Sequence, residues 1–360
     1  MMGWVLAAAL ALPTPVGGNT PPGREQIMAV PPELQTLVEE RVNAPGRSQS
    51  KRMRRLIELM STSPDGMRLD YRDDATLTVE QAFQNHQANC LTYTLVFLAL
   101  AKQAGLNAYP QEIDETLAWQ QHEDIVYRSN HVNAAVNIGG NRFVVDVGSR
   151  FVIPRSPAHP ISENRLLAQY YNNRAAQLMT LEDLPAALAH ADIAIELDPR
   201  YATSWSNTGV LRLHSGDPLG AEQAYLTALS LTPENSSALF NLVSLYKRNG
   251  DHKLEAQYQG RLDKIQSKDP FHQYLLAVEL EKRGQYAQAI QRYKRAIRLY
   301  GDEHRFYYGL SRVYTQAGNT FRAKRALQRA LELVTTREED ELTIIQYRTM
   351  LDDLRATGGL

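Results

Sequence analysis

The sequence predicts an α+β domain followed by an all-α helical solenoid. Three observations lead to this prediction. A nearly continuous apolar run from Leu91 to Ala101 follows the only cysteine, Cys90, and an alternating segment turns back at Gly139-Gly140. After about residue 164, glycines and alanines recur every 34 residues. A chain of 360 residues is long enough for both parts, and its 43% hydrophobic content suffices for packed cores.

The first residues resemble an export signal. Gly3 to Leu12 is an apolar run too short to span a bilayer, and it predicts a signal peptide over residues 1–20. We therefore expect a periplasmic or secreted protein with no stable membrane anchor. No Lys or Arg precedes Arg24, so a cytoplasmic protein with a disordered tail is the alternative. A single cysteine rules out an internal disulfide.

Residues 21–64 are expected to form a proline-rich linker and N-terminal helices, and residues 65–160 the α+β domain. Pro32 to Asn43 has a helical pattern, and the basic cluster that begins at Arg47 continues as an amphipathic helix to Met60. Within the α+β domain, Thr78 and Gln81 have the spacing of a capping box, which predicts the start of a short helix.

Cys90 is predicted to lie in the first turn of a buried helix that ends at Gly105. In that turn, unpaired backbone N–H groups and the helix dipole favour a thiolate over a thiol. Cys90 is therefore a candidate nucleophile. The alternative is that it is a small buried hydrophobic residue.

A predicted β-hairpin supplies partners for the thiol. His131 to Ile138 alternates in polarity, Gly139-Gly140 suits a two-residue turn, and Asn141 to Val147 returns. With that turn, Ile138 pairs with Asn141, and His131 and Asp146 become diagonal neighbours on one face, within reach of a hydrogen bond. A three-residue loop would place them on opposite faces.

These residues resemble the transglutaminase-like (papain-related) superfamily, whose members carry a helix cysteine, then a strand histidine, then a strand aspartate. The matching segments are Asn89-Cys90-Leu91, Phe97 to Leu106, Asn130-His131-Val132 and Val144-Val145-Asp146. The resemblance covers about residues 65–155. It is nearest to bacterial members that are fused to tetratricopeptide repeats.

The resemblance implies a role for each residue. Cys90 would attack an amide carbonyl, His131 would take and return the proton, and Asp146 would fix the imidazole tautomer. Gln84 has the spacing of the papain-type oxyanion glutamine; the alternative is an ordinary exposed helix residue. The superfamily also contains inactive binding versions. Peptidase, transglutaminase and amidase chemistry all remain open, and none needs a cofactor.

The repetition after residue 164 predicts tetratricopeptide repeats. Gly216, Gly250, Gly284 and Gly318 are each 34 residues apart, and alanines recur with the same period. We expect a five-unit array over residues 164–337, with units at 168–201, 202–235, 236–269, 270–303 and 304–337. The third unit is degenerate, with Glu255 and Leu262 at alanine positions. Residues 338–360 would form a capping helix and tail.

One position of each predicted repeat points to a ligand groove. The fifth residues of four units, Asn172, Phe240, Tyr274 and Tyr308, would line a groove for a protein or peptide. The alternative is that the three aromatic rings only pack between units.

Other binding sites have little support in the sequence. The nine histidines show no metal-ligand spacing, no glycine-rich phosphate loop is present, and the net charge of −1 favours no nucleic acid. The sequence thus predicts a thiol enzyme acting on amide bonds, with repeats that bind substrate or partner. The alternative is a non-catalytic assembly scaffold. Neither prediction fixes the oligomeric state.

Overall fold

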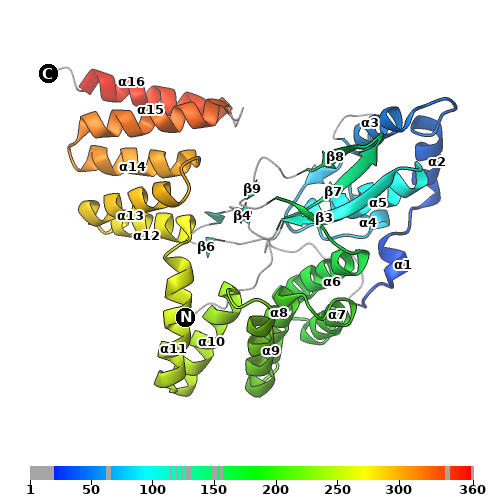
Figure 1. The fold of residues 1–360 in the computed structure, drawn as a ribbon, viewed down its shortest axis with the longest axis horizontal. Helices are drawn as coiled ribbons and strands as arrows, with labels where there is room; N and C mark the ends of the chain where they lie inside the picture. Colours follow the sequence, from blue (N-terminus) through cyan, green and yellow to red (C-terminus); the bar gives the residue numbers. More distant parts are fainter. Residues whose placement is uncertain are drawn as a thin grey trace. The chain divides into compact units, whose positions relative to one another are not determined.

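The computed structural model describes residues 20–61, 66–113, 116–118, 121–122, 125–126, 131–147, 152–154, 157–336 and 341–357 (Figure 1). The chain divides into two compact units, Met1–Glu255 and Ala256–Leu360. The predicted signal peptide lies almost entirely outside the described residues. Within the described residues, no helix has both the length and the apolar character needed to cross a membrane.

Three helices begin the described part of the first unit: α1 (Arg24–Ile27), α2 (Pro32–Arg41) and α3 (Gln49–Met60). Proline at the first position of α2 fits the helix start, since the missing N–H would have no partner there. The Ser48 hydroxyl caps α3. The apolar sides of these helices enter the core that also contains α5.

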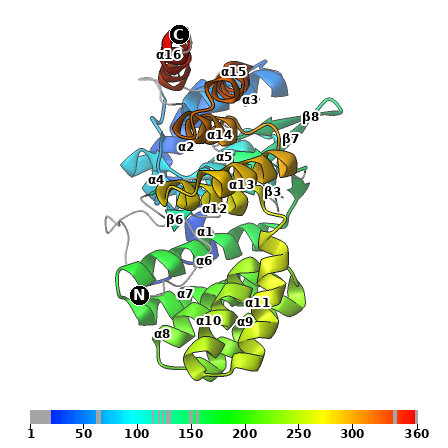
Figure 2. The same cartoon turned by 90° about the vertical axis from the view of Figure 1, so that its left-hand side faces the viewer.

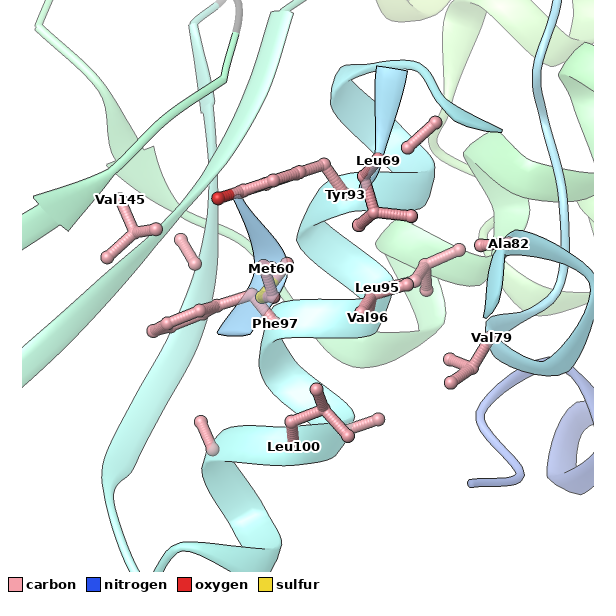
Figure 3. Close-up of a cluster of buried hydrophobic side chains, with 14 of the residues drawn as sticks. Met60, Leu69, Val79, Ala82, Tyr93, Leu95, Val96, Phe97, Leu100 and Val145 are labelled. Atoms are coloured by element: carbon pink, nitrogen blue, oxygen red, sulfur yellow. The ribbon is translucent and has the colours of Figure 1, made fainter. Parts of the chain in front are cut away.

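Helix α5 (Cys90–Gln103) is the centre of this core. Residues Leu91 to Ala101 are buried except for the half-buried Leu98. Figure 3 shows Tyr93 and Phe97 pointing from α5 toward the strands, and Leu95 and Val96 on the side nearer α4 (Val79–Asn85). The predicted capping box of Thr78 and Gln81 at the start of α4 is confirmed.

A four-stranded antiparallel sheet packs against α5, in the order β10-β3-β7-β8. These strands are β10 (His159–Pro160), β3 (Asn107–Ile113), β7 (His131–Ile138) and β8 (Asn141–Val145). The predicted hairpin register is confirmed, because Ile138 pairs with Asn141. Gly139 and Gly140 both have positive φ, as a two-residue turn of this kind requires.

Two features of this region differ from the prediction. Both faces of β7 are buried, since His131, Asn133 and Ala135 are as covered as their apolar neighbours. The segment after Tyr109, for which the sequence analysis predicted no strand, continues β3 and then contains β4 (Thr116–Ala118), β5 (Gln121–His122) and β6 (Ile125–Val126). Three further short strands lie elsewhere in this unit: β1 (Asp70–Tyr71), β2 (Gln87–Ala88) and β9 (Val152–Pro154).

Paired helices complete the first unit. They are α6 (Glu163–Thr180), α7 (Leu184–Leu197), α8 (Ala202–His214), α9 (Pro218–Leu231) and α10 (Ser236–Asn249), and α11 (His252–Gln266) contains the boundary between the units. Consecutive helices among α6 to α10 pack on one another (Figure 2). The core crosses the predicted domain boundary, because Leu166, Tyr170 and Tyr171 of α6 belong to the core of α5.

The second unit is a stack of antiparallel helices (Figure 1). It contains α12 (Pro270–Lys282), α13 (Tyr286–Leu299), α14 (His304–Gln316), α15 (Thr320–Thr336) and α16 (Glu341–Thr357). Small residues let the helices approach: Ala277, Ala289, Ala323 and Ala330 are all fully buried. Helix α16 packs on α15 at the position expected for the capping helix.

The four turn glycines all have positive φ, between 71° and 83°. The turn of the first helical pair has a glutamate instead. Glu182, 34 residues before Gly216, adopts φ 62°. The backbone conformation of this turn is therefore kept even where the sequence provides no glycine.

Candidate functional site

The position of Cys90 is fixed by its neighbour. Asn89 is the N-cap of α5, and its Oδ1 accepts the Thr92 backbone N–H at 2.8 Å. The Asn89 amide also donates to Thr76 Oγ1 at 2.8 Å. Cys90 is consequently the first residue of the helix and is half-buried. Its placement in the first turn agrees with the prediction.

His131 and Asp146 meet on the sheet beside this helix end. The Nε2 atom of His131 lies 2.8 Å from both carboxylate oxygens of Asp146. Since Nε2 is engaged there, Nδ1 is the ring nitrogen left for Cys90. The structure therefore brings together the three residues that the sequence singled out.

The electrostatics of His131 reflect this arrangement. Burial alone would lower its pKa, but hydrogen bonds to Asp146 and Cys90, together with their negative charges, raise it to about 10. With this pKa, the His131 imidazole holds its proton at neutral pH.

Asn133 also contacts Asp146, although the sequence analysis did not select it as a site residue. Its Nδ2 donates to Asp146 Oδ2 at 3.1 Å, and its side chain is buried. The predicted register placed Asn133 opposite Asp146, and that pairing was the signal that could have identified it.

Two tyrosines lie close to Cys90, His131 and Asp146. Burial raises the pKa of Tyr71, and the negative charges of Cys90 and Asp73 raise it further. Burial, followed by the charge of Asp146, raises the pKa of Tyr93 to about 12. Tyr93 lies one helical turn after Cys90 and could have been found from that spacing. Tyr71 comes from β1, whose parallel pairing with β2 brings Tyr71 opposite Ala88 and is not visible in the sequence.

Gln84 does not join this group through its amide. It lies on the exposed side of α4, and its Nε2 donates to Glu80 Oε1 at 3.2 Å. The i, i+4 spacing on one helix explains this contact. These observations favour the alternative, that Gln84 is an ordinary helix surface residue, over the oxyanion assignment.

The predicted groove residues in the first unit lie in different environments. Asn172 is buried in α6, and its Oδ1 accepts the Asn207 amide of α8 at 3.1 Å. Its contact is therefore between neighbouring repeats. Phe240 in α10 is half-buried.

In the second unit, the predicted groove aromatics contact other rings. Tyr274 lies 5.3 Å from Phe306, between ring centroids, and Tyr308 stacks on Tyr347 of α16 at 4.8 Å. These contacts are those of the packing alternative. Both tyrosines are half-buried.

In the part of the chain that the structure describes, no group of three or more His, Cys, Asp or Glu side chains could hold a metal ion.

The helical pairs match known protein families. Two family profiles, both described as tetratricopeptide repeat, match residues 172–236, 215–270 and 280–338. The helical pairs are tetratricopeptide repeats. Neither profile extends to Cys90, His131 or Asp146.

Similar curated proteins share only part of their length with the chain. The Hsp70-Hsp90 organizing protein of Triticum aestivum is 35% identical over 77 residues, which is 21% of this chain and 13% of that protein. The human protein O-mannosyl-transferase TMTC3 is 25% identical over 210 residues, 56% of this chain and 22% of that protein. The chain thus spans less than a quarter of the length of either relative.

Two solved structures are also similar to part of the chain. MamA from Desulfovibrio magneticus RS-1 is 17% identical, covering 50% of this chain and 99% of that chain with a TM-score of 0.27. YrrB, described as a tetratricopeptide repeat protein with an unusual peptide-binding site, is 21% identical, covering 51% and 92% with a TM-score of 0.27.

Proposed function

We propose that this protein binds a protein or peptide through its tetratricopeptide repeats and acts on amide bonds through the thiol of Cys90. The observation that carries the catalytic part is the joint contact of His131 with Asp146 and Cys90. A nucleophile, a base and a group that orients the base are the minimum set for covalent acyl transfer.

Each residue has a defined step in the proposed reaction. The Cys90 thiolate attacks the amide carbonyl carbon and forms a tetrahedral intermediate. His131 gives its proton to the leaving amine, and a thioester remains on Cys90. Asp146 holds the His131 tautomer throughout through Nε2. Water or an amine then attacks the thioester, which gives hydrolysis or acyl transfer respectively.

The start of α5 would stabilise the oxyanion. The N–H groups in the first turn of a helix have no partner within the helix, and the Cys90 N–H is one of them. Because the Gln84 amide is bonded to Glu80, it supplies no support for a second donor.

The repeats support the binding part of the proposal. The curated relatives that share these repeats include the Hsp70-Hsp90 organizing protein. We carry over from them only the class of ligand, a protein or peptide. Export to the periplasm remains a proposal that rests on the apolar N-terminal run.

The first test is the pH dependence of Cys90 alkylation by iodoacetamide, in the wild type and in His131→Ala. The chain has one thiol, so the signal has a single source. We expect fast alkylation near pH 7 in the wild type, and about tenfold or greater slowing without the imidazolium. Asn137→Ala, an exposed residue on the same strand, is the control and should react like the wild type.

A second candidate function is a non-catalytic assembly scaffold. The family matches favour it over catalysis, since they cover the repeats and not the Cys90 site. The variant Cys90→Ala separates the two functions. Loss of amide-bond chemistry with partner binding retained supports the enzyme, whereas an unchanged cellular function supports the scaffold. A Cys90 that is inert until the protein is denatured would also favour the scaffold.

A further inference from the structure

Two buried amide side chains next to the proposed site have atoms without hydrogen-bond partners. Gln111 on β3 is 0% exposed, and both its Nε2 and its Oε1 are unpartnered. Asn133 on β7 is 3% exposed, and its Oδ1 is unpartnered. Buried polar groups almost always find partners, so such atoms require an explanation.

These two residues are direct neighbours. Gln111 pairs with Asn133 in the antiparallel register of β3 and β7. Residues paired in this way share one face of the sheet, and their Cβ atoms are about 4.5–5.5 Å apart. The longer Gln111 side chain can therefore bring its amide to Asn133 by rotation about its own bonds.

Asn133 in turn contacts Asp146, the residue that orients the proposed base His131. Its Nδ2 donates to Asp146 Oδ2 at 3.1 Å, and Asp146 accepts from His131. The four side chains thus lie in the spatial order Gln111, Asn133, Asp146 and His131.

The orientation of the Asn133 amide matters for Asp146. An amide presents a donor at one end and an acceptor at the other, and only the donor end suits a carboxylate. A donor on the far side of Asn133 would hold its Oδ1 away from Asp146. The Gln111 Nε2 group is a donor at that position in the sheet.

We propose that Gln111 and Asn133 are positioning residues for the thiol site, with Gln111 Nε2 donating to Asn133 Oδ1 so that Asn133 Nδ2 faces Asp146. This inference rests on the proposed thiol chemistry of Cys90. It assigns neither residue to the reacting atoms, because both act through Asp146.

A residue kept for packing alone would behave differently. Replacing a buried amide that lacks partners by an apolar side chain of similar size removes an unfavourable group and leaves stability equal or higher. Gln111→Met is such a replacement. If Gln111 serves packing alone, Gln111→Met should therefore keep an equal or higher Tm and leave the reactivity of Cys90 unchanged. If Gln111 Nε2 donates to Asn133 Oδ1, the substitution leaves that buried acceptor unpaired, and we expect a lower Tm together with slower alkylation of Cys90.

The test compares iodoacetamide alkylation profiles of Gln111→Met, Asn133→Leu and the double variant in the full chain. We expect alkylation at pH 7 to slow about tenfold in Asn133→Leu, because Asn133 contacts Asp146 directly, and about threefold in Gln111→Met, because Gln111 acts only through Asn133. The control Asn137→Leu, exposed on the same strand, should leave the profile unchanged.

The double variant is the decisive measurement. If Gln111 acts through Asn133, the double variant should react like Asn133→Leu alone, because coupled residues are not additive. Independent, additive effects would overturn the inference, as would a wild-type profile in Gln111→Met. If Asn133→Leu does not fold, the smaller substitution Asn133→Ala, which also removes both the donor and the acceptor, takes its place with the same expectation.

Failure of the inference and failure of the proposed function give different results. A wild-type Cys90 that is inert in the folded protein contradicts the thiol function itself, and the inference falls with it. A reactive wild-type thiol that slows in His131→Ala but not in the Gln111 and Asn133 variants contradicts only the positioning role.

Discussion

At the scale of single residues, His131 is important both for the fold and for the proposed chemistry. It is 2% exposed, yet its pKa is raised to about 10. A buried cation is tolerated here because the carboxylate of Asp146, 2.8 Å away, compensates its charge.

This raised pKa predicts a pH-dependent contribution to stability. The folded His131 binds its proton more tightly than the unfolded residue, whose pKa is near 6.5. The stabilisation is therefore fully present below about pH 6.5 and is lost as the pH rises toward 10. We expect the Tm difference between the wild type and His131→Gln to shrink across this range in thermal melts. A difference that grows with pH would contradict the ion-pair assignment.

Some site residues follow from local sequence and others do not. Cys90, His131 and Asp146 could be predicted because a helix start and a two-residue hairpin turn fix their places over short distances. Gln111 and Tyr71 could not, because their positions depend on β3–β7 and β1–β2 pairings between segments far apart in the chain. The two alternatives for Gln84 could not be separated either, because spacing from Cys90 along the chain does not show which side of the helix is exposed.

At the scale of elements, the N-terminus of α5 depends on Asn89. Its side chain accepts from Thr92 and donates to Thr76, and it is buried. We expect Asn89→Ala to lower the free energy of unfolding by about 2 kcal/mol, the upper end for a lost N-cap. Urea unfolding measures this value.

Ser48→Ala is the matched control for that substitution. Ser48 caps α3 in an exposed position, at 3.4 Å from the Lys51 N–H. Its loss should cost about 0.5 kcal/mol, at the lower end for a cap. Equal costs for both variants would show that the Asn89 contacts add nothing to ordinary capping.

In the repeat turns, by contrast, one substitution is predicted to raise the free energy of unfolding. Glu182 has φ 62°, a conformation that favours glycine. Glu182→Gly should therefore stabilise the protein by about 1 kcal/mol, whereas Gly216→Ala at the equivalent turn should destabilise it by about as much. Thermal or urea unfolding of both variants tests this pair, and a destabilised Glu182→Gly would contradict the backbone argument.

The repeats were the most predictable elements of the chain. Their period recurs in every unit, so each glycine and alanine confirms the others, and the third unit was visible as degenerate. Helix α11 in that unit buries only Tyr258 and Leu262, and the boundary between the compact units falls within it. The sequence pattern could not show that α6 also belongs to another core, because its apolar residues serve both sides of the helix.

At the scale of the whole chain, the first unit joins the thiol site to the first repeat. Arg165 of α6 pairs with Glu112 of β3 at 3.1 Å and with Asp198 at 2.9 Å. The Gln177 amide donates to the Asp74 carbonyl at 2.7 Å, in the loop that also binds Asn89. Polar contacts and a common apolar core therefore link α6 to the segment around Cys90.

This joint core predicts the result of truncation. A chain of residues 20–161 contains Cys90, His131 and Asp146 but loses Leu166, Tyr170 and Tyr171 from its core. We expect it to lack a cooperative unfolding transition and to show the alkylation profile of a cysteine in an unfolded chain. Residues 20–201, which keep α6 and α7, should melt cooperatively by circular dichroism. A cooperative transition in the shorter chain would contradict the shared core.

Because α6 belongs both to the core around α5 and to the first repeat, it also limits how this protein can change during evolution. Repeats gained or lost beyond Tyr201 alter the binding surface without touching the interior around Cys90. A recombination breakpoint inside the first helical pair would instead remove part of that interior. New partners can thus be acquired by exchange of distal repeats, while the first pair is inherited together with the thiol.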